Sequence, residues 1–219
     1  MINTAAYKLL IEELKTTNST LVAVSKTKPV EDIQALYKLG QRDFGENYVQ
    51  ELVDKEAALP KDIHWHFIGH LQSNKVKFIA PFVYLIHGVD SFKLLQEINK
   101  QAAKNNRIID CLLQIHIAQE ETKFGFDEAE LEELFSSDIT NLSSICIKGM
   151  MGMASFSDDK DKVRCEFKRL KFLFNKYKNI STANCQLSIV SMGMSGDYKL
   201  AIEEGTTMVR IGSMLFGSR

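Results

Sequence analysis

The chain has 219 residues, 45% of them apolar and 25% charged, which is the composition of an ordinary globular domain and excludes a disordered or fibrous protein. Its 27 basic and 28 acidic residues nearly cancel, so the positive field that attracts nucleic acids is missing. The first fifteen residues contain Glu12, Glu13 and two lysines among their apolar side chains, so we expect neither a secretory leader nor a membrane span. The four cysteines form no C-x-x-C pair, so we expect reduced, buried thiols in a cytoplasmic protein.

Helix-like and strand-like segments alternate along the whole chain. An apolar stripe predicts a first helix over Ala5–Leu14, and helical periodicity recurs over Val30–Tyr37, Phe92–Ile98 and Lys162–Tyr177. Between these segments, eight short apolar runs predict β-strands: Leu21–Ser25, Arg42–Gly45, His64–Ile68, Val83–His87, Cys111–Ile117, Ile145–Met151, Leu187–Ser191 and Met208–Ile211.

This alternation predicts a closed parallel barrel. Several strands are nearly continuous apolar runs, as expected for parallel strands that are buried on both faces. Eight strand–helix units suit a (β/α)8 barrel of about 200 residues, whereas a doubly wound sheet has about five or six strands and a glycine-rich first turn. We predict one α/β domain over residues 1–219, a TIM barrel with an extra N-terminal helix. Only a few residues follow the eighth strand, so Ala5–Leu14 is expected to help cover the barrel.

Phosphate-binding residue types follow the last two predicted strands. Barrels commonly bind phosphate with these two loops, because glycine lets backbone N–H groups approach an anion and serine donates a hydroxyl. Ordinary βα turns favour the same residue types, but their occurrence at both positions favours a phosphate site. The residues concerned are Ser191, Gly193, Ser195, Gly212 and Ser213.

Lys26 directly follows the first predicted strand. At the mouth of a barrel its stem would pack among apolar walls, where loss of solvent disfavours the ammonium form. A neutral amine can form a Schiff base with a carbonyl compound. The alternative interpretation is a solvated lysine at a strand end, which is what we expect for Lys28 beside Pro29.

Arg210 lies at the end of the last predicted strand, next to the expected phosphate loop. A guanidinium that faces a pyridine nitrogen would leave the ring unprotonated and make it a poorer electron sink. The competing interpretation, a phosphate or carboxylate partner for Arg210, remains open.

Three other patterns predict structural roles. His64 and His66 share one side of a strand at a spacing that a metal could use, with His70 or His87 able to converge on them, but no third ligand is evident and we predict no metal site. The S-x-x-K match at 157–160 is interpreted as a helix cap. Two strand ends carry methionines that could line a flat ring or fill the core, namely Met150, Met151, Met153, Met192 and Met194.

Six longer motifs run through the chain in order: AVSKTKP (23–29), FGENYVQE (44–51), HFIGHLQSNK (66–75), GMMGM (149–153), SMGMS (191–195) and MVRIG (208–212). Together they resemble the pyridoxal phosphate homeostasis proteins, the YggS/PROSC-like family, whose fold is similar to the N-terminal barrel of alanine racemase. The resemblance extends from about Leu21 to Gly217, and several long matches in order are far more specific than one short motif.

This resemblance implies a site for pyridoxal 5′-phosphate (PLP), held as a Schiff base on Lys26. Arg210 matches the arginine expected near the pyridine nitrogen, and Asn47 is expected beside the ring. The residues that would hold the phosphate are Ser191, Gly193, Ser195, Gly212 and Ser213.

The resemblance also implies a function. Family members are regarded as regulators or carriers of PLP with no settled catalytic activity. Similar alanine racemases carry a further β-rich domain with a catalytic tyrosine, which has no counterpart in these 219 residues. We therefore expect intracellular PLP homeostasis, by buffering or delivery of the cofactor, with no catalytic residues, no nucleic acid, no membrane, a monomeric state and apo PLP-dependent enzymes as candidate partners. A PLP-dependent amino-acid racemase or lyase is the alternative, and a barrel for another phosphorylated aldehyde or sugar is a third.

Overall fold

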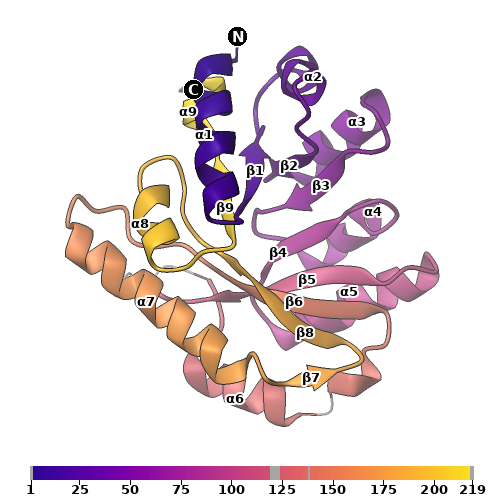
Figure 1. Cartoon of the computed structure of the whole chain (residues 1–219). Coiled ribbons are helices and arrows are strands. Elements are labelled where there is room, and N and C mark those ends of the chain that lie inside the picture. Colours follow the sequence, from indigo (N-terminus) through magenta and orange to yellow (C-terminus); the bar gives the residue numbers. More distant parts are fainter. Residues whose placement is uncertain (1, 119–123, 138, 218–219) are drawn as a thin grey trace.

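The computed structural model describes residues 2–118, 124–137 and 139–217. Eight parallel strands form a closed ring in the order β6-β5-β4-β3-β2-β1-β9-β8, and pairing of β6 with β8 completes it (Figure 1). A short strand, β7, pairs antiparallel with β8 outside the ring. The strand bounds are β1 Thr20–Val24, β2 Asp43–Glu46, β3 His64–Phe67, β4 Leu85–Val89, β5 Ile109–Ile115, β6 Ile145–Gly152, β7 Ser181–Thr182, β8 Cys185–Ser191 and β9 Met208–Ile211. The predicted eight-stranded barrel is confirmed, with strand ends displaced by one or two residues.

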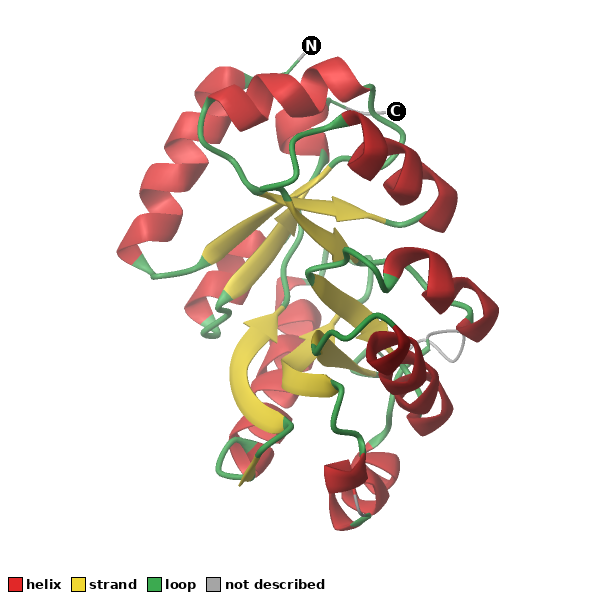
Figure 2. Cartoon of the chain, turned by 90° about the vertical axis from the view of Figure 1, so that its right-hand side faces the viewer, coloured by secondary structure: helices red, strands yellow, loops and turns green. Residues whose placement is uncertain are grey.

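Helices surround the strands on the outside (Figure 2). Each of the helical segments predicted from periodicity is present and is somewhat longer than predicted. The helix bounds are α1 Thr4–Thr16, α2 Val30–Lys38, α3 Val49–Ala58, α4 Val76–Ile79, α5 Phe92–Lys104, α6 Glu128–Ser136, α7 Lys160–Tyr177, α8 Tyr198–Glu203 and α9 Ser213–Phe216, with 3-10 turns at Ser73–Lys75 and Ile139–Asn141. Among the helices within the described ranges, none is long and apolar enough to cross a bilayer.

The first helix covers the part of the barrel where the last helix is short. Helix α1 lies beside α9 and β1 (Figure 1), and the Asn3 backbone N–H donates to the Leu215 carbonyl at 2.7 Å. Tyr7, Leu10 and Leu14 form its buried stripe. This confirms the expectation that the N-terminal helix helps to cover the barrel, because α9 has only four residues and cannot bury that face alone.

Two apolar clusters share the barrel wall. The larger fills the space between the strands and the helices. The smaller lies inside the ring, because alternate residues of a strand face opposite sides, and consists of Val22, Leu85, Leu112, Met151 and Met208. Inward-facing polar residues must therefore find partners among one another, since little water reaches this interior.

The four cysteines are free, and three of them, Cys111, Cys146 and Cys185, are buried as expected. Cys165 is exposed, so the expectation of four buried thiols is wrong for this residue. It lies on the outer face of α7, whose opposite face carries the buried Phe167 and Leu170.

The turn after β1 holds Lys26 in a constrained backbone. Thr27 has φ +61°, a left-handed conformation that is unfavourable for a β-branched residue. The Thr27 N–H donates to Glu51 Oε1 at 2.6 Å, and Lys55 Nζ donates to the Ser25 carbonyl at 2.7 Å. Helix α3 thus fixes the residues on both sides of Lys26.

A buried ion cluster maintains this contact between α3 and the turn. Lys55 Nζ lies 2.8 Å from Glu46 Oε1 and 2.7 Å from Glu51 Oε1, and the Ser25 hydroxyl donates to Glu46 at 2.6 Å. Burial raises the pKa of Glu46, and the charge and hydrogen bonds of Lys55 and Ser25 offset this only in part. The cluster depends on one ammonium between two carboxylates.

We expect Lys55→Met to lower the free energy of unfolding by about 3 kcal/mol, because removal of one partner leaves buried carboxylates uncompensated. Urea denaturation followed by fluorescence of the single tryptophan measures the effect. Lys61→Met is the matched control: its ion pair with Glu56 is exposed, and we expect a change of about 0.5 kcal/mol or less. Equal losses in the two variants would contradict the assignment.

Barrel closure depends on a close approach at Gly149. A Cβ atom on Gly149 would clash with the backbone carbonyl oxygen of Ile189 on the neighbouring strand β8. Since neither strand can move without opening the ring, we expect Gly149→Ala to destabilise the fold by about 3 kcal/mol. Thermal unfolding by circular dichroism tests this, with Gly196→Ala as the control because a Cβ there has no neighbour within 4 Å. An unperturbed Gly149→Ala protein would show that the ring closes elsewhere.

Candidate functional site

A cavity of about 400 Å³ opens at the carboxyl ends of the barrel strands. Its volume lies within the range of about 300–1,000 Å³ that is usual for small-molecule and cofactor sites. The lining comes from β1, β2, β3, β6, β8 and β9 and the loops after them: Val24, Lys26, Asn47, Ile68, Met153, Ser155, Phe156, Ser157, Asp158, Val163, Met194, Ser195, Gly196, Asp197, Arg210, Gly212 and Ser213.

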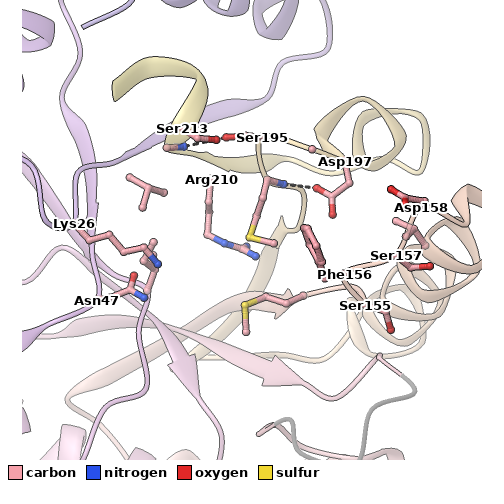
Figure 3. A pocket seen from close by; sticks show the side chains of 17 residues that line it. Lys26, Asn47, Ser155, Phe156, Ser157, Asp158, Ser195, Asp197, Arg210 and Ser213 are labelled. Atoms are coloured by element: carbon pink, nitrogen blue, oxygen red, sulfur yellow. Dashed lines mark hydrogen bonds between the residues drawn. The ribbon is translucent and has the colours of Figure 1, made fainter. Parts of the chain in front are cut away.

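Lys26 and Asn47 extend into this cavity from the same side (Figure 3). Lys26 is half-buried and belongs to the turn that α3 fixes. The Asn47 Oδ1 atom is buried and has no hydrogen-bond partner among the described residues. An orphaned acceptor of this kind is costly, so the carbonyl of Asn47 suits a ligand that brings a donor.

The loops after β8 and β9 meet at the opposite side of the cavity. Ser195 Oγ accepts the Gly212 N–H at 3.3 Å, and Figure 3 shows Ser195 and Ser213 next to each other. Within the described part of the chain, no hydrogen bond uses the backbone N–H of Ser195, Gly196 or Ser213. Unpaired N–H groups and hydroxyls in two adjoining loops are the donors that bind phosphate.

Gly193 shapes the first of these loops without lining the cavity. Its φ of +96° is in the left-handed range, and a Cβ there would lie 2.6 Å from the Ala201 Cβ. Asp197 then closes the loop, because its Oδ1 accepts the Met194 N–H at 2.6 Å. Burial raises the pKa of Asp197, while the Met194 N–H and Arg210 oppose that rise.

Arg210 forms the floor of the cavity, between Lys26 and the loop that carries Phe156 (Figure 3). Its Nη1 donates to Ser191 Oγ at 2.6 Å and to the Ser191 carbonyl at 2.9 Å, and its Nη2 donates to the Gly152 carbonyl at 3.1 Å. Burial lowers the pKa of Arg210 to about 10, and Asp197 opposes this. The guanidinium stays charged at neutral pH, and no carboxylate within the described ranges forms an ion pair with it.

The structure therefore brings six of the eight predicted site residues to one cavity, namely Lys26, Asn47, Ser195, Arg210, Gly212 and Ser213. Ser191 is fully buried beneath Arg210. Gly193 belongs to the loop after β8 but does not line the cavity. Both contribute to the site through their neighbours.

Lys28 has a structural role that the sequence did not indicate. Its Nζ donates to the carbonyls of Phe216 and Gly217 at 3.0 and 3.2 Å, where cations favour a helix C-terminus. The expectation of a merely solvated lysine at this position is wrong. The ammonium fixes the end of α9, whose first residue, Ser213, lines the cavity.

The loop after β6 adds lining residues that the sequence analysis missed. Phe156 is fully exposed at the entrance, and Ser155 lies beneath it. The Ser155 N–H and hydroxyl both donate to the buried Glu166 carboxylate at 2.7 Å, so α7 fixes this loop. The only feature of the sequence that could have indicated these residues is the position of their loop directly after a predicted strand.

The methionines serve both purposes that the sequence left open. Met153 and Met194 line the cavity. Met150 and Met192 belong to the outer core, and Met151 fills the barrel interior. The S-x-x-K match at 157–160 is a helix start as predicted, because Asp159 caps α7.

The predicted structural histidines are also confirmed. His64 and His66 both contact Asp43, and His66 additionally contacts His87. His70 does not converge with them, because it pairs with Asp90 at 3.1 Å on the exterior.

The amine of Lys26, the two loops with phosphate-binding donors and the guanidinium of Arg210 thus all face the same cavity. A flat, anionic carbonyl compound is the ligand class that this set of groups fits best, since the amine can bond to a carbonyl carbon while the loops hold an anion.

Comparison with known proteins identifies the family. The profile of the family "Alanine racemase, N-terminal domain" matches residues 2–219. A pyridoxal phosphate homeostasis protein of Aquifex aeolicus is 42% identical over 91% of this chain and 86% of its own length. The protein of the same name from Escherichia coli K12 is 37% identical over 91% of this chain and 86% of its own length.

Solved structures agree with this assignment. PipY of Synechococcus elongatus PCC7942, in a structure with PLP bound, has a TM-score of 0.85 and 32% identity, covering 97% of this chain and 99% of PipY. An alanine racemase of Clostridium difficile has a TM-score of 0.77 at 18% identity and covers all of this chain but 61% of the racemase, a likeness of fold alone. The chain belongs to the pyridoxal phosphate homeostasis protein family, which has the barrel fold of the alanine racemase N-terminal domain.

Proposed function

We propose that this chain binds PLP at the carboxyl ends of its barrel strands and acts in PLP homeostasis. The single observation that carries the proposal is that Lys26, Arg210 and the loops of Ser195 and Ser213 line one cavity of about 400 Å³. Family membership supports it, because relatives carry the name of PLP homeostasis proteins and PipY has a structure with PLP bound.

Each group of the site has a role toward this cofactor. When bound, PLP would supply an aldehyde that condenses with an amine and a ring that absorbs visible light. Lys26 Nζ would be that amine. The hydroxyls of Ser195 and Ser213 and the unused N–H groups of Ser195, Gly196 and Ser213 would hold the phosphate, with Gly212 fixing Ser195, Gly193 setting the turn and Ser191 fixing Arg210.

Arg210 and Asn47 would determine how the ring sits. A guanidinium has no acceptor and keeps its protons, so Arg210 beside the pyridine nitrogen would donate to it and leave it uncharged. The orphaned Asn47 Oδ1 would accept a hydrogen bond from a donor that the bound cofactor brings. Both contacts favour retention of the cofactor over carbanion chemistry, which needs a protonated ring as an electron sink.

The chain would therefore buffer or deliver PLP and have no turnover of its own. Two-base racemisation needs an acid–base group on each face of the substrate. No histidine, tyrosine or cysteine is among the described residues that line the cavity. We further propose that residues 1–219 act as one monomeric domain in the cytoplasm and that apo PLP-dependent enzymes receive the cofactor.

We expect the purified protein with PLP to show an absorption band at about 420 nm, where a pyridoxal group bonded to a lysine absorbs. Lys26→Ala should abolish the band and leave the far-ultraviolet circular dichroism unchanged. Lys28→Ala is the matched control, because Lys28 belongs to the same motif but donates to carbonyls at the end of α9. Its band should persist at saturating PLP. Persistence of the band in Lys26→Ala would refute the assignment of the amine.

The alternative function, a PLP-dependent amino-acid racemase or lyase, is tested directly. We expect the PLP-loaded protein, incubated with L-alanine in deuterated water, to exchange the α-proton no faster than free PLP does, because no histidine, tyrosine or cysteine stands opposite Lys26 among the described residues that line the cavity. Mass spectrometry and chiral chromatography measure exchange and the D-enantiomer, with an authentic alanine racemase as the positive control. Steady exchange at enzymatic rates would replace the carrier function by the racemase function.

A further inference from the structure

A continuous chain of hydrogen bonds crosses the interior of the barrel and ends at Arg210. It links Arg210 Nη1 to Ser191 Oγ at 2.6 Å, Ser191 Oγ to His87 Nδ1 at 3.2 Å, His87 Nε2 to His66 Nδ1 at 2.9 Å, and His66 Nε2 to Asp43 Oδ1 at 3.0 Å. Asp43 is the first residue of β2 and Arg210 lies near the end of β9, so the chain joins the two ends of the barrel.

Except for Asp43, whose side chain is 24% exposed, the members of this chain have no solvent to replace a lost partner. His66, His87 and Ser191 are fully buried, and Arg210 is 4% exposed. The apolar side chains of Val22, Leu85, Leu112, Met151 and Met208 share the same interior. Buried polar atoms that lose their partner bear the full cost of desolvation, so each link requires the next.

The chemistry of its two ends determines where every proton lies. Arg210 can only donate, so Ser191 Oγ accepts from Arg210 and keeps its own proton for another acceptor, which a neutral His87 with its proton on Nε2 offers at Nδ1. The Asp43 carboxylate can only accept, so His66 Nε2 carries a proton. His66 Nδ1 is then the acceptor for His87 Nε2–H. The Asp43 end, together with the neutrality of both rings, thus imposes one direction of donation, from Arg210 to Asp43, and one tautomer, with the proton on Nε2 of each histidine.

The titration behaviour of these groups is consistent with that arrangement. Burial lowers the pKa of His66, and burial together with the charge of Arg210 lowers that of His87, so both imidazoles are neutral at neutral pH. Burial raises the pKa of Asp43, but the hydrogen bonds from His66 and His64 oppose it, and the net pKa is lowered. An ionised carboxylate and two neutral rings are what a one-directional chain needs.

The Asp43 end meets a second cavity, of about 650 Å³, at the amino-terminal ends of the strands. His64 lies there and donates to the same Asp43 oxygen at 3.2 Å. It is stacked on Tyr84 with ring centroids 4.3 Å apart, and its side chain is 43% exposed. His64 is therefore a branch on the carboxylate and is outside the path to Arg210.

We propose that His66 and His87 are positioning residues that hold the Arg210 guanidinium in place from the opposite end of the barrel, through Ser191. Without them the Ser191 hydroxyl is free to turn its proton toward Arg210, and the guanidinium loses its shortest acceptor. We call the hydrogen bonds from Arg210 through Ser191, His87 and His66 to Asp43 the relay. The relay acts on PLP only through Arg210, so its effect on the cofactor rests on the proposed function. The relay itself is a property of the cofactor-free protein.

The first test examines the relay without cofactor. Nitrogen NMR of imidazole-labelled protein, with the five histidines assigned by single substitutions, should show His66 and His87 neutral with the proton on Nε2 at neutral pH. The ring nitrogens Nδ1 should have the chemical shifts of hydrogen-bond acceptors. A proton on Nδ1 of either ring, or a charged His87, would overturn the proposal whatever the protein binds.

The second test examines the effect on the cofactor. His87→Phe keeps a ring of similar size but breaks both links, and we expect PLP to be held about tenfold more weakly, the equivalent of one or two lost hydrogen bonds, with a shifted absorption band. His87→Asn offers an oxygen near the position of Nδ1 and should recover part of both effects. His64→Gln is the matched control, because it touches the same carboxylate outside the path, and should retain wild-type affinity and spectrum.

Parallel denaturation separates positioning from general destabilisation. If His87→Phe and His87→Asn lose stability but retain the wild-type affinity and band, or if His64→Gln shifts them as much as the His87 variants do, the relay does not position Arg210. If the wild-type protein with intact tautomers binds no PLP, the proposed function fails and the relay stands.

Discussion

Closure of the sheet into a ring is the constraint on which the rest of the structure depends. Pairing of β1 with β9 joins the two ends of the series of strand–helix units, and pairing of β6 with β8 at Gly149 keeps the ring complete. Once the ring is closed, β1 lies beside β9, and Lys26 reaches the cavity that Arg210 and Ser213 also line. Residues almost two hundred positions apart in the chain share one site because the first and last barrel strands are neighbours.

Every polar group that the closed ring encloses also needs a hydrogen-bond or ion-pair partner. Two internal networks provide such partners. The ammonium of Lys55 compensates Glu46 and Glu51 and fixes the backbone around Lys26. The histidines inside the ring connect Arg210 with Asp43. Each network terminates next to a group that we assign to the cofactor, so the buried polar residues of this protein stabilise its site as much as its fold.

These two networks give the proposed carrier function a physical basis. A carrier has to present an amine and an anion cradle in fixed positions, but it needs no proton donor on the second face of a substrate. The turn around Lys26 is held by α3, the end of α9 by Lys28 and the Arg210 guanidinium by three acceptor contacts. Pre-organisation of this kind favours retention of a bound ring and adds nothing to carbanion chemistry, where an uncharged pyridine is a weak electron sink.

The sequence by itself determined the eight barrel strands, the covering role of the first helix, the strand-end position of Lys26 and the two serine- and glycine-rich loops. These features are local, because hydrophobic periodicity and residue type at a strand end can be read within a few positions. Tertiary structure alone decided that Ser191 lies beneath Arg210, that Lys55 is buried and that His66 and His87 share a hydrogen bond. Lys55 and Glu51 are four positions apart on α3, a spacing that says nothing of burial, and His87 and Ser191 are 104 positions apart. Which polar groups face each other inside a ring depends on register and closure across distant strands, and no local pattern encodes that.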